Sequence, residues 1–212
     1  MVQKKKAVEV SGITKKYGPI TAVENVSFNV IEDEIFGFFG PNGTGRTTLV
    51  RILTTLVKPT SGSASVAGYD VVKKPDEVRQ HIGVIPPGDD ERLDITGYKN
   101  MDIYGRFYGV LSGEREESIH YLLETVGLTA RAHDLVATYS GGMRRRLEIA
   151  RVLVRKPEIL FLDKPTIGLA PQSRHVVWDF LRKLREEDTM TVFLTTHYNG
   201  EGRGLMQQGC HY

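Results

Sequence analysis

The sequence predicts an α/β protein that also has an antiparallel β portion and a helical insert. Short apolar runs at 34–40, 158–163 and 190–197 fit buried strands. The segments at 7–14 and 22–31 alternate apolar and polar residues, as half-buried strands do. From about residue 96 to 155 the apolar spacing is mostly helical, so an insert interrupts an α/β core that resumes after it.

The elements between these strands follow from their own patterns. "GRTTLVRILTTLV", at 45–57, has helical spacing and is predicted to end near Pro59. The residues of its apolar face are Leu49, Ile52, Leu53 and Leu56. "SGSASVAGYDV", at 61–71, indicates a strand pair around turns, and "SRHVVWDFLRKLREE", at 173–187, has the period of an amphipathic helix.

The composition limits the classes of protein that are possible. The chain has 212 residues, of which 40% are apolar and 25% charged, as in a globular protein with a real core. A net charge of +2 predicts no strong attraction to nucleic acid, so no nucleic-acid partner is expected. The single cysteine, Cys210, excludes an internal disulfide framework and fits a reducing compartment. Neither a signal peptide nor an apolar run of the roughly 18 residues needed to span a bilayer is present, so the chain is expected to be soluble by itself.

"FFGPNGTGRTTLVRIL", at 38–53, contains most of a phosphate-binding loop. That pattern needs glycine, four residues, glycine, lysine and then serine or threonine. Gly40, Gly45 and Thr47 satisfy it, whereas Arg46 replaces the lysine with a planar fork. The glycines let backbone N–H groups surround a phosphate at the positive end of a helix, and Thr47 can offer its hydroxyl to Mg²⁺. The alternative is a glycine-rich turn with no ligand, against which the spacing weighs.

A second motif lies about 120 residues further along the chain. "EILFLDKP" has four apolar residues between Glu158 and Asp163, as in a strand whose last residue holds Mg²⁺ beside phosphates. Many buried strands end in aspartate, so this motif is weak by itself. Together with the phosphate loop it predicts a nucleotide site.

A third stretch, "YSGGMRRRLEIARVLVRKPEILFLDKPTIGLAP" at 139–171, resembles the ATP-binding subunits of ABC transporters. Their signature is Leu-Ser-Gly-Gly-Gln, which the five residues from Tyr139 to Met143 match with two substitutions. The resemblance covers about 7–198 and implies a P-loop NTPase core of the ABC ATPase type. It also implies a head-to-tail dimer with two nucleotides between the subunits. Alone, the Ser-Gly-Gly turn could be only a helix N-cap.

The resemblance assigns roles to individual residues. Tyr17 would stack on adenine, although it could also be an edge tyrosine, and His197 would be a switch at the γ-phosphate unless it is an incidental residue at a strand end. ATP and Mg²⁺ are the implied cofactors, with Thr47 and Asp163 at the metal. The remaining predicted nucleotide contacts are Gly40, Pro41, Asn42, Gly43, Thr44, Gly45, Arg46, Thr47 and Thr48, with Ser140, Gly141, Gly142 and Met143 acting on the nucleotide of the second subunit.

Four positions depart from the family pattern, and all are expected at the nucleotide. Besides Arg46, Lys164 replaces the glutamate that polarises the attacking water, and a charged lysine cannot accept its proton. Pro87 replaces the glutamine that reaches the metal, and Ala170 replaces an aspartate that communicates across the dimer. Since loss of a general base costs ~10²–10⁴ in rate, hydrolysis is expected to be slow or undetectable while binding persists.

The predicted organisation has four parts. They are a core β and phosphate-loop part at 1–94, a helical signature insert at 95–155, the rest of the core at 156–198, and an aberrant tail at 199–212. The tail is glycine-rich and aperiodic where the resemblance implies a helix and another core strand. Suitable synonymous codons shifted by one base permit a family-like peptide, so a frameshift that removes the C-terminal strand and leaves a sheet edge uncovered is predicted.

The segments at 54–71 and 93–110 look most like subunits of daunorubicin-resistance-type exporters. The implied function is an ATP-binding subunit that drives a drug or other small hydrophobic molecule through a membrane permease. It would lie in the cytoplasm on the inner face of the plasma membrane, dimerised with itself or a related subunit. A catalytically inactive partner subunit and a decayed gene product stay open as alternatives. The single-domain length argues against a soluble ABC ATPase that acts on ribosomes or DNA.

Overall fold

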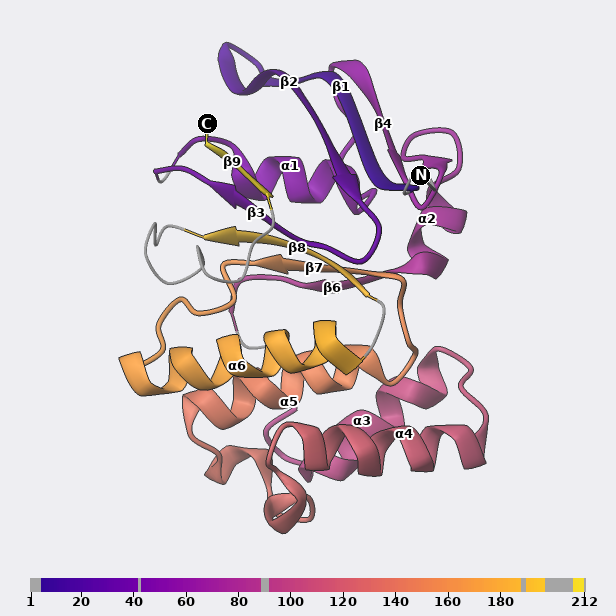
Figure 1. The fold of residues 1–212 in the computed structure, drawn as a ribbon, viewed down its shortest axis with the longest axis vertical. Helices are drawn as coiled ribbons and strands as arrows, with labels where there is room; N and C mark the ends of the chain where they lie inside the picture. The colour runs from indigo at the N-terminus through magenta and orange to yellow at the C-terminus, as the bar shows by residue number, and fades with distance from the viewer. Residues whose placement is uncertain (1–4, 42, 89–91, 188–189, 197–207, 212) are drawn as a thin grey trace. The chain divides into compact units, whose positions relative to one another are not determined.

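In the computed structural model the chain forms two compact units (Figure 1). We call them the core unit, residues 1–86, 158–164 and 184–212, and the helical unit, residues 87–157 and 165–183. The structure describes residues 5–41, 43–88, 92–187, 190–196 and 208–211. The domain boundaries inferred from the sequence remain predictions.

The core unit contains two sheets. The first is antiparallel in the order β2-β1-β4-β5 and the second is parallel in the order β6-β7-β8-β3-β9. The antiparallel strands are β1 (Lys6–Tyr17), β2 (Ile20–Ile31), β4 (Ser61–Val66) and β5 (Tyr69–Asp70). The parallel strands are β3 (Ile35–Phe39), β6 (Ile82–Ile85), β7 (Ile159–Asp163), β8 (Thr191–Thr196) and β9 (Gln208–His211). The predicted α/β fold with an antiparallel β portion is confirmed.

Aromatic side chains make much of the core between the two sheets. Phe28 of β2 stacks on Phe36 of β3 with ring centroids 5.2 Å apart, and Phe36 stacks on Phe193 of β8 at 5.4 Å. Phe161 of β7 lies 5.3 Å from Phe193. Every residue of β3, β7 and β8 is buried, as continuous apolar strands of a parallel sheet are. This packing fixes the ends of β3 and β7, where the nucleotide motifs begin.

Helix α1 (Arg46–Leu53) is shorter than its apolar pattern predicts. Its amide-to-carbonyl bonds, from Thr55 to Ile52 at 3.0 Å and from Leu56 to Arg51 at 2.8 Å, form a Schellman motif, with Thr55 left-handed at φ 66°. The prediction that Leu56 belongs to the buried face is wrong, since its side chain is 69% exposed. Glycine usually marks such an end, and here threonine occupies the position.

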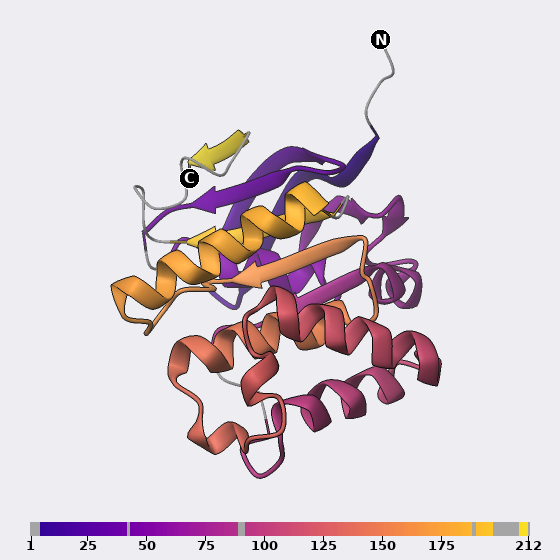
Figure 2. The same ribbon diagram turned by 60° about the horizontal axis from the view of Figure 1, so that its bottom comes forward.

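The helical unit holds three helices that pack on one another (Figure 2). They are α3 (Gly97–Phe107), α4 (Ser112–Thr125) and α5 (Gly141–Leu153). Helix α6 (Pro171–Glu187) begins in this unit, while the short α2 (Pro75–His81) belongs to the core unit. None of the described helices has the length and apolar composition that crossing a membrane requires.

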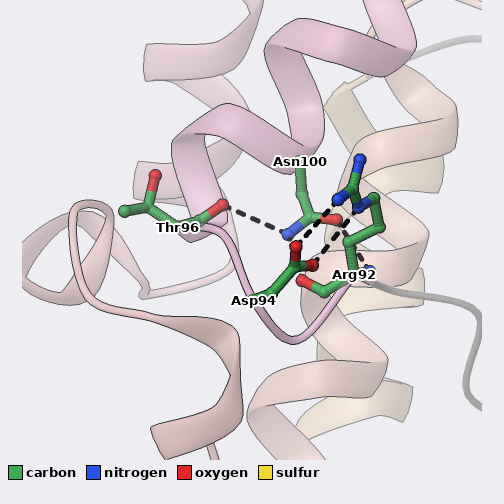
Figure 3. Close-up of polar contacts among 4 residues, drawn as sticks. All are labelled: Arg92, Asp94, Thr96 and Asn100. Carbon is green, nitrogen blue, oxygen red and sulfur yellow. Dashed lines mark hydrogen bonds and ion pairs between the residues drawn. The ribbon is translucent and has the colours of Figure 1, made fainter.

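A buried amide shapes the start of α3 (Figure 3). The Asn100 side chain accepts from the backbone N–H of Arg92 at 3.1 Å and donates to the carbonyls of Arg92 at 2.9 Å and Thr96 at 3.2 Å. Arg92 in turn forms a two-pronged pair with the carboxylate of Asp94. Asn100 therefore replaces the missing backbone partners of an irregular loop, which explains a polar side chain only 4% exposed.

The prediction that the C-terminal strand is missing is wrong. Strand β9 pairs in parallel with the outer side of β3, with Phe36 opposite Gln208 and Phe39 opposite His211. Pairing of this kind uses backbone N–H and C=O groups, and every residue except proline provides both. An aperiodic segment can therefore cover a sheet edge that a side-chain pattern would not reveal.

Candidate nucleotide-binding site

The phosphate loop connects β3 to α1 in the core unit. Gly45 caps α1 with a left-handed backbone at φ 76°. A Cβ atom at Gly45 would lie 1.8 Å from the carbonyl oxygen of Ala22 in β2, so only glycine fits. The hydroxyl of Thr44 donates to the carbonyl of Pro41 at 3.0 Å and closes the loop on itself. The loop therefore turns tightly against β2 and leaves the N-terminus of α1 open.

A pocket of about 270 Å³ lies at that helix end. Its lining comes from 43–48, from Ile20 to Ala22 in β2, and from Lys164 after β7. The predicted contacts from Gly43 to Thr48 are thus brought together, whereas Gly40 and Pro41 do not line it. No carboxylate is part of this lining, so the described wall of the pocket carries only positive charge.

Arg46 is the first residue of α1, and only 3% of it is exposed. Its Nη1 donates to the carbonyl of Thr196 at the end of β8, and its Nη2 donates to the carbonyl of Pro41 at 3.1 Å. Burial lowers the pKa of Arg46, while the negative charge of Asp163 opposes that shift. The guanidinium therefore holds two backbone carbonyls together across the loop, which a lysine ammonium could not do with the same planar geometry.

Asp163 ends β7 beside Thr195 of β8. Its Oδ1 accepts a hydrogen bond from the Thr195 hydroxyl at 2.6 Å, and the aspartate is 2% exposed. The backbone N–H of Lys164 donates to both the hydroxyl and the carbonyl of Thr195, each at 3.1 Å. Lys164 has a left-handed backbone at φ 54°. These bonds fix the lysine backbone at the strand end, and Lys164 is one of the residues that line the pocket.

The side chains at this site do not fit Mg²⁺. The ion prefers octahedral oxygen ligands, usually carboxylates with water and phosphate. Thr47 and Asp163 are the predicted ligands, but Asp163 is buried and already accepts from Thr195, and Lys164 brings a cation to the same pocket. Within the described residues, no three His, Cys, Asp or Glu side chains cluster closely enough to hold a metal.

Tyr17, Pro87 and Ala170, which the resemblance places at the nucleotide, do not line this pocket. Tyr17 ends β1 opposite Ile20, is 45% exposed, and has the Lys15 ammonium 4.9 Å above its ring, so the ring is accessible without lining the pocket. Pro87 and Ala170 are exposed residues of the helical unit. Asn42 and His197 lie outside the described residues.

The signature turn begins α5 in the helical unit. Ser140 is the N-cap, and its hydroxyl accepts from the backbone N–H of Met143 at 3.3 Å. Gly142 is buried, and a Cβ there would lie 2.7 Å from the Ser173 hydroxyl, so a larger residue would not fit. Ser140 and Gly141 are exposed. The cap itself is thus present, and contact with a second nucleotide stays a prediction.

Arg145 and Glu148 of α5 form a buried ion pair that the sequence patterns missed. Arg145 also donates from Nε to the carbonyl of Pro165 at 2.9 Å and from Nη1 to the carbonyl of Gly88 at 3.2 Å. Those two residues directly follow the altered positions Lys164 and Pro87. The sequence does contain a signal for this ion pair: Glu148 lies within the apolar stretch "LEIARVLV", and Arg145 lies three residues before it.

The loop that opens α1 and the buried aspartate of the same sheet define a P-loop nucleotide-binding protein. The family model described as "ABC transporter" matches residues 23–167, and the chain belongs to that family. Its fold matches the ADP conformation of an ATP-binding cassette of an ABC transporter, with a TM-score of 0.87 over 98% of this chain and 87% of that one at 22% identity. Members of the family bind ATP, generally with Mg²⁺, and their ATP-binding subunits work with membrane permeases.

Several relatives are proteins of export and drug resistance. The chain is 39% identical over 208 residues to a linearmycin resistance ATP-binding protein of Bacillus subtilis, covering 95% of this chain and 67% of the relative. It is 42% identical over 203 residues to the daunorubicin/doxorubicin resistance ATP-binding protein of Streptomyces peucetius, covering 96% and 61%. A Nod factor export ATP-binding protein of Paraburkholderia xenovorans is 37% identical over 204 residues, covering 96% and 67%. The chain thus spans about two thirds or less of these relatives, and the predicted resemblance is confirmed.

Proposed function

We propose that this chain is the ATP-binding subunit of an export system, that it binds ATP at the phosphate loop, and that its own hydrolysis is impaired. One observation carries the proposal. The loop keeps the tight backbone turn that Gly45 permits, while the residue that lines its pocket from the end of β7 is Lys164. The names of the relatives support an exported drug or other small hydrophobic molecule as the cargo.

Binding rests on the backbone rather than on the altered side chains. Backbone N–H groups at a helix N-terminus attract phosphate, and the loop presents them at the open end of α1. Thr47 and Thr48 add hydroxyl groups to the same wall. These groups are independent of a catalytic base, so affinity for the nucleotide survives its loss.

Hydrolysis of the bound ATP, unlike its binding, depends on the side chain at position 164. Hydrolysis requires a group that takes a proton from the attacking water, and a charged lysine has no free electron pair for it. Removing such a base lowers the rate by ~10²–10⁴. Lys164 lies where the family places a glutamate, so slow or absent phosphate release is expected. This observation also favours a second candidate, a catalytically inactive ATP-binding partner of an active subunit.

The partners follow from the family. A membrane permease would hold the chain against the inner face of the plasma membrane, and a head-to-tail dimer would bring Ser140 to Met143 of one subunit to the nucleotide of the other. The exposed positions of Ser140 and Gly141 at the start of α5 support such access.

The test is an ATP titration of the purified, folded chain by calorimetry, followed by measurement of phosphate release from the saturated complex. The expected result is saturable binding with phosphate release at least about 10²-fold below that of a variant with the family residues restored. Absence of binding in a sample shown to be folded would refute the nucleotide-binding proposal. Release by the natural chain as fast as by the restored variant would refute the impairment.

A further inference from the structure

The charge of the phosphate pocket is unusual for a site that is expected to hold a metal. Its cationic side chains are Arg46 and Lys164, and its other polar side chains are threonine hydroxyls. Among the described residues that line it there is no carboxylate. A divalent cation entering this pocket would find no anionic ligand on its described wall, whereas a polyphosphate would find Lys164 and the N-terminal end of α1.

The backbone of Lys164 is held at the end of β7, while its ammonium group is unpaired among the described residues. Two hydrogen bonds from its backbone N–H to Thr195 fix its main chain at the end of β7. Within the described part of the chain, no carboxylate forms an ion pair with its ammonium group. An unpaired ammonium beside a phosphate loop supplies three donors to phosphate oxygens.

Asp163 is not part of the pocket lining. It is 2% exposed, and its Oδ1 accepts from the Thr195 hydroxyl. Its negative charge acts instead on the buried guanidinium of Arg46. One oxygen of the carboxylate that the motif reserves for a metal is therefore already engaged by a neighbouring hydroxyl.

We propose that this pocket binds the triphosphate of a nucleotide in its metal-free form, with the Lys164 ammonium in the role that a divalent cation otherwise has. The inference rests on the proposed function, and it adds which form of the ligand the site selects. A metal-free triphosphate carries more negative charge than its magnesium complex, so it gains more from the Lys164 ammonium and from the positive end of α1. A bound magnesium ion would also lie near the ammonium, and like charges at short range repel. Magnesium therefore weakens binding.

The experiment is a calorimetric titration of the full chain with ATP, once with excess EDTA and once with excess Mg²⁺, at fixed ionic strength because salt screens charge. We expect the dissociation constant in EDTA to be at least about tenfold lower, equivalent to about 1.4 kcal/mol. Lys164→Glu should reverse the order, since a carboxylate repels the bare triphosphate and provides a ligand for magnesium. Lys164→Gln should abolish the preference for EDTA without adding a carboxylate.

Lys58→Glu is the matched control, because it makes the same change of charge at an exposed lysine beyond the other end of α1. It should keep the preference of the natural chain for EDTA. Circular dichroism establishes that every variant is folded. Glutamate and glutamine meet the same left-handed backbone as lysine, so neither adds a new backbone requirement.

The outcomes separate this inference from the proposed function. Equal or tighter binding of ATP with Mg²⁺ than with EDTA in the natural chain would overturn the inference and leave nucleotide binding intact. The same loss in Lys58→Glu as in Lys164→Glu would also overturn it, because the effect would then be one of net charge. No binding under either condition, in folded protein, would overturn both.

Discussion

The contact between Gly45 and β2 gives a sharp test of the loop geometry. In Gly45→Ala the new methyl group would lie 1.8 Å from the Ala22 carbonyl oxygen and 2.8 Å from Cγ2 of Val23, so the backbone must shift. Gly43→Ala is the matched control, since Gly43 is also left-handed, at φ 88°, but a Cβ there has nothing within 4 Å. Both variants therefore share the backbone strain, and only Gly45→Ala adds the steric conflict.

The two contributions can be estimated separately. A left-handed backbone costs a residue with a Cβ about 1–2 kcal/mol, which applies to both variants. Forcing an extra methyl into a packed site costs about 1–3 kcal/mol more, which applies to Gly45→Ala alone. For a chain of this size each kcal/mol lowers the melting temperature by about 2–4 °C, so a difference of about 1–3 kcal/mol corresponds to roughly 2–12 °C.

The assay is urea unfolding followed by far-ultraviolet circular dichroism, with thermal unfolding as a second measure. Gly45→Ala should unfold at a clearly lower urea concentration than Gly43→Ala, with the dependence of free energy on urea unchanged. Equal midpoints for the two variants would refute the reasoning, because the loop could not then lie against the carbonyl of β2.

Three further predictions concern the site and its supports. Restoring the family residues by Arg46→Lys, Lys164→Glu and Pro87→Gln together should raise phosphate release by at least about 10²-fold, and Arg46→Lys alone should not; recovery with the single change would contradict the assigned roles. Arg145→Met leaves a buried carboxylate without its cation and should lower the free energy of unfolding by about 3–5 kcal/mol in urea titrations, whereas a loss under 1 kcal/mol would mean that the ion pair does not hold its loops. Asn100→Ala should cost about 1–3 kcal/mol and speed amide hydrogen exchange in the loop before α3, and unchanged exchange there would exclude a role of this side chain in fixing that loop.

The sequence predicted the parts of the fold whose signal is the burial of side chains. Strands β3 and β7 are apolar at every or nearly every position, β8 has the apolar centre Val192 to Leu194 between threonines, and the structure buries all three strands. The phosphate loop was predictable because its glycines are required by geometry, as Gly45 shows. The apolar pattern of β7 also predicted that Asp163 and Lys164 lie at a strand end, as the structure has them.

The sequence failed where the backbone or a buried charge decides the structure. The end of α1 is followed by Thr55, which has a left-handed conformation that glycine normally adopts. Because no glycine marks this end, the apolar pattern predicted that the buried face extends to Leu56. Strand β9 pairs through its backbone and has no periodic pattern to detect. Arg145 and Glu148 were missed because charged residues on a helix usually face water, and only the packing around α5 shows that these two do not.

The register of β9 has a practical consequence for how the protein is handled. His211 lies opposite Phe39, the last residue before the phosphate loop begins. A fluorescent label on Cys210, which lies opposite Phe38 in the same strand pair, would therefore be attached next to the strand that leads into the phosphate loop.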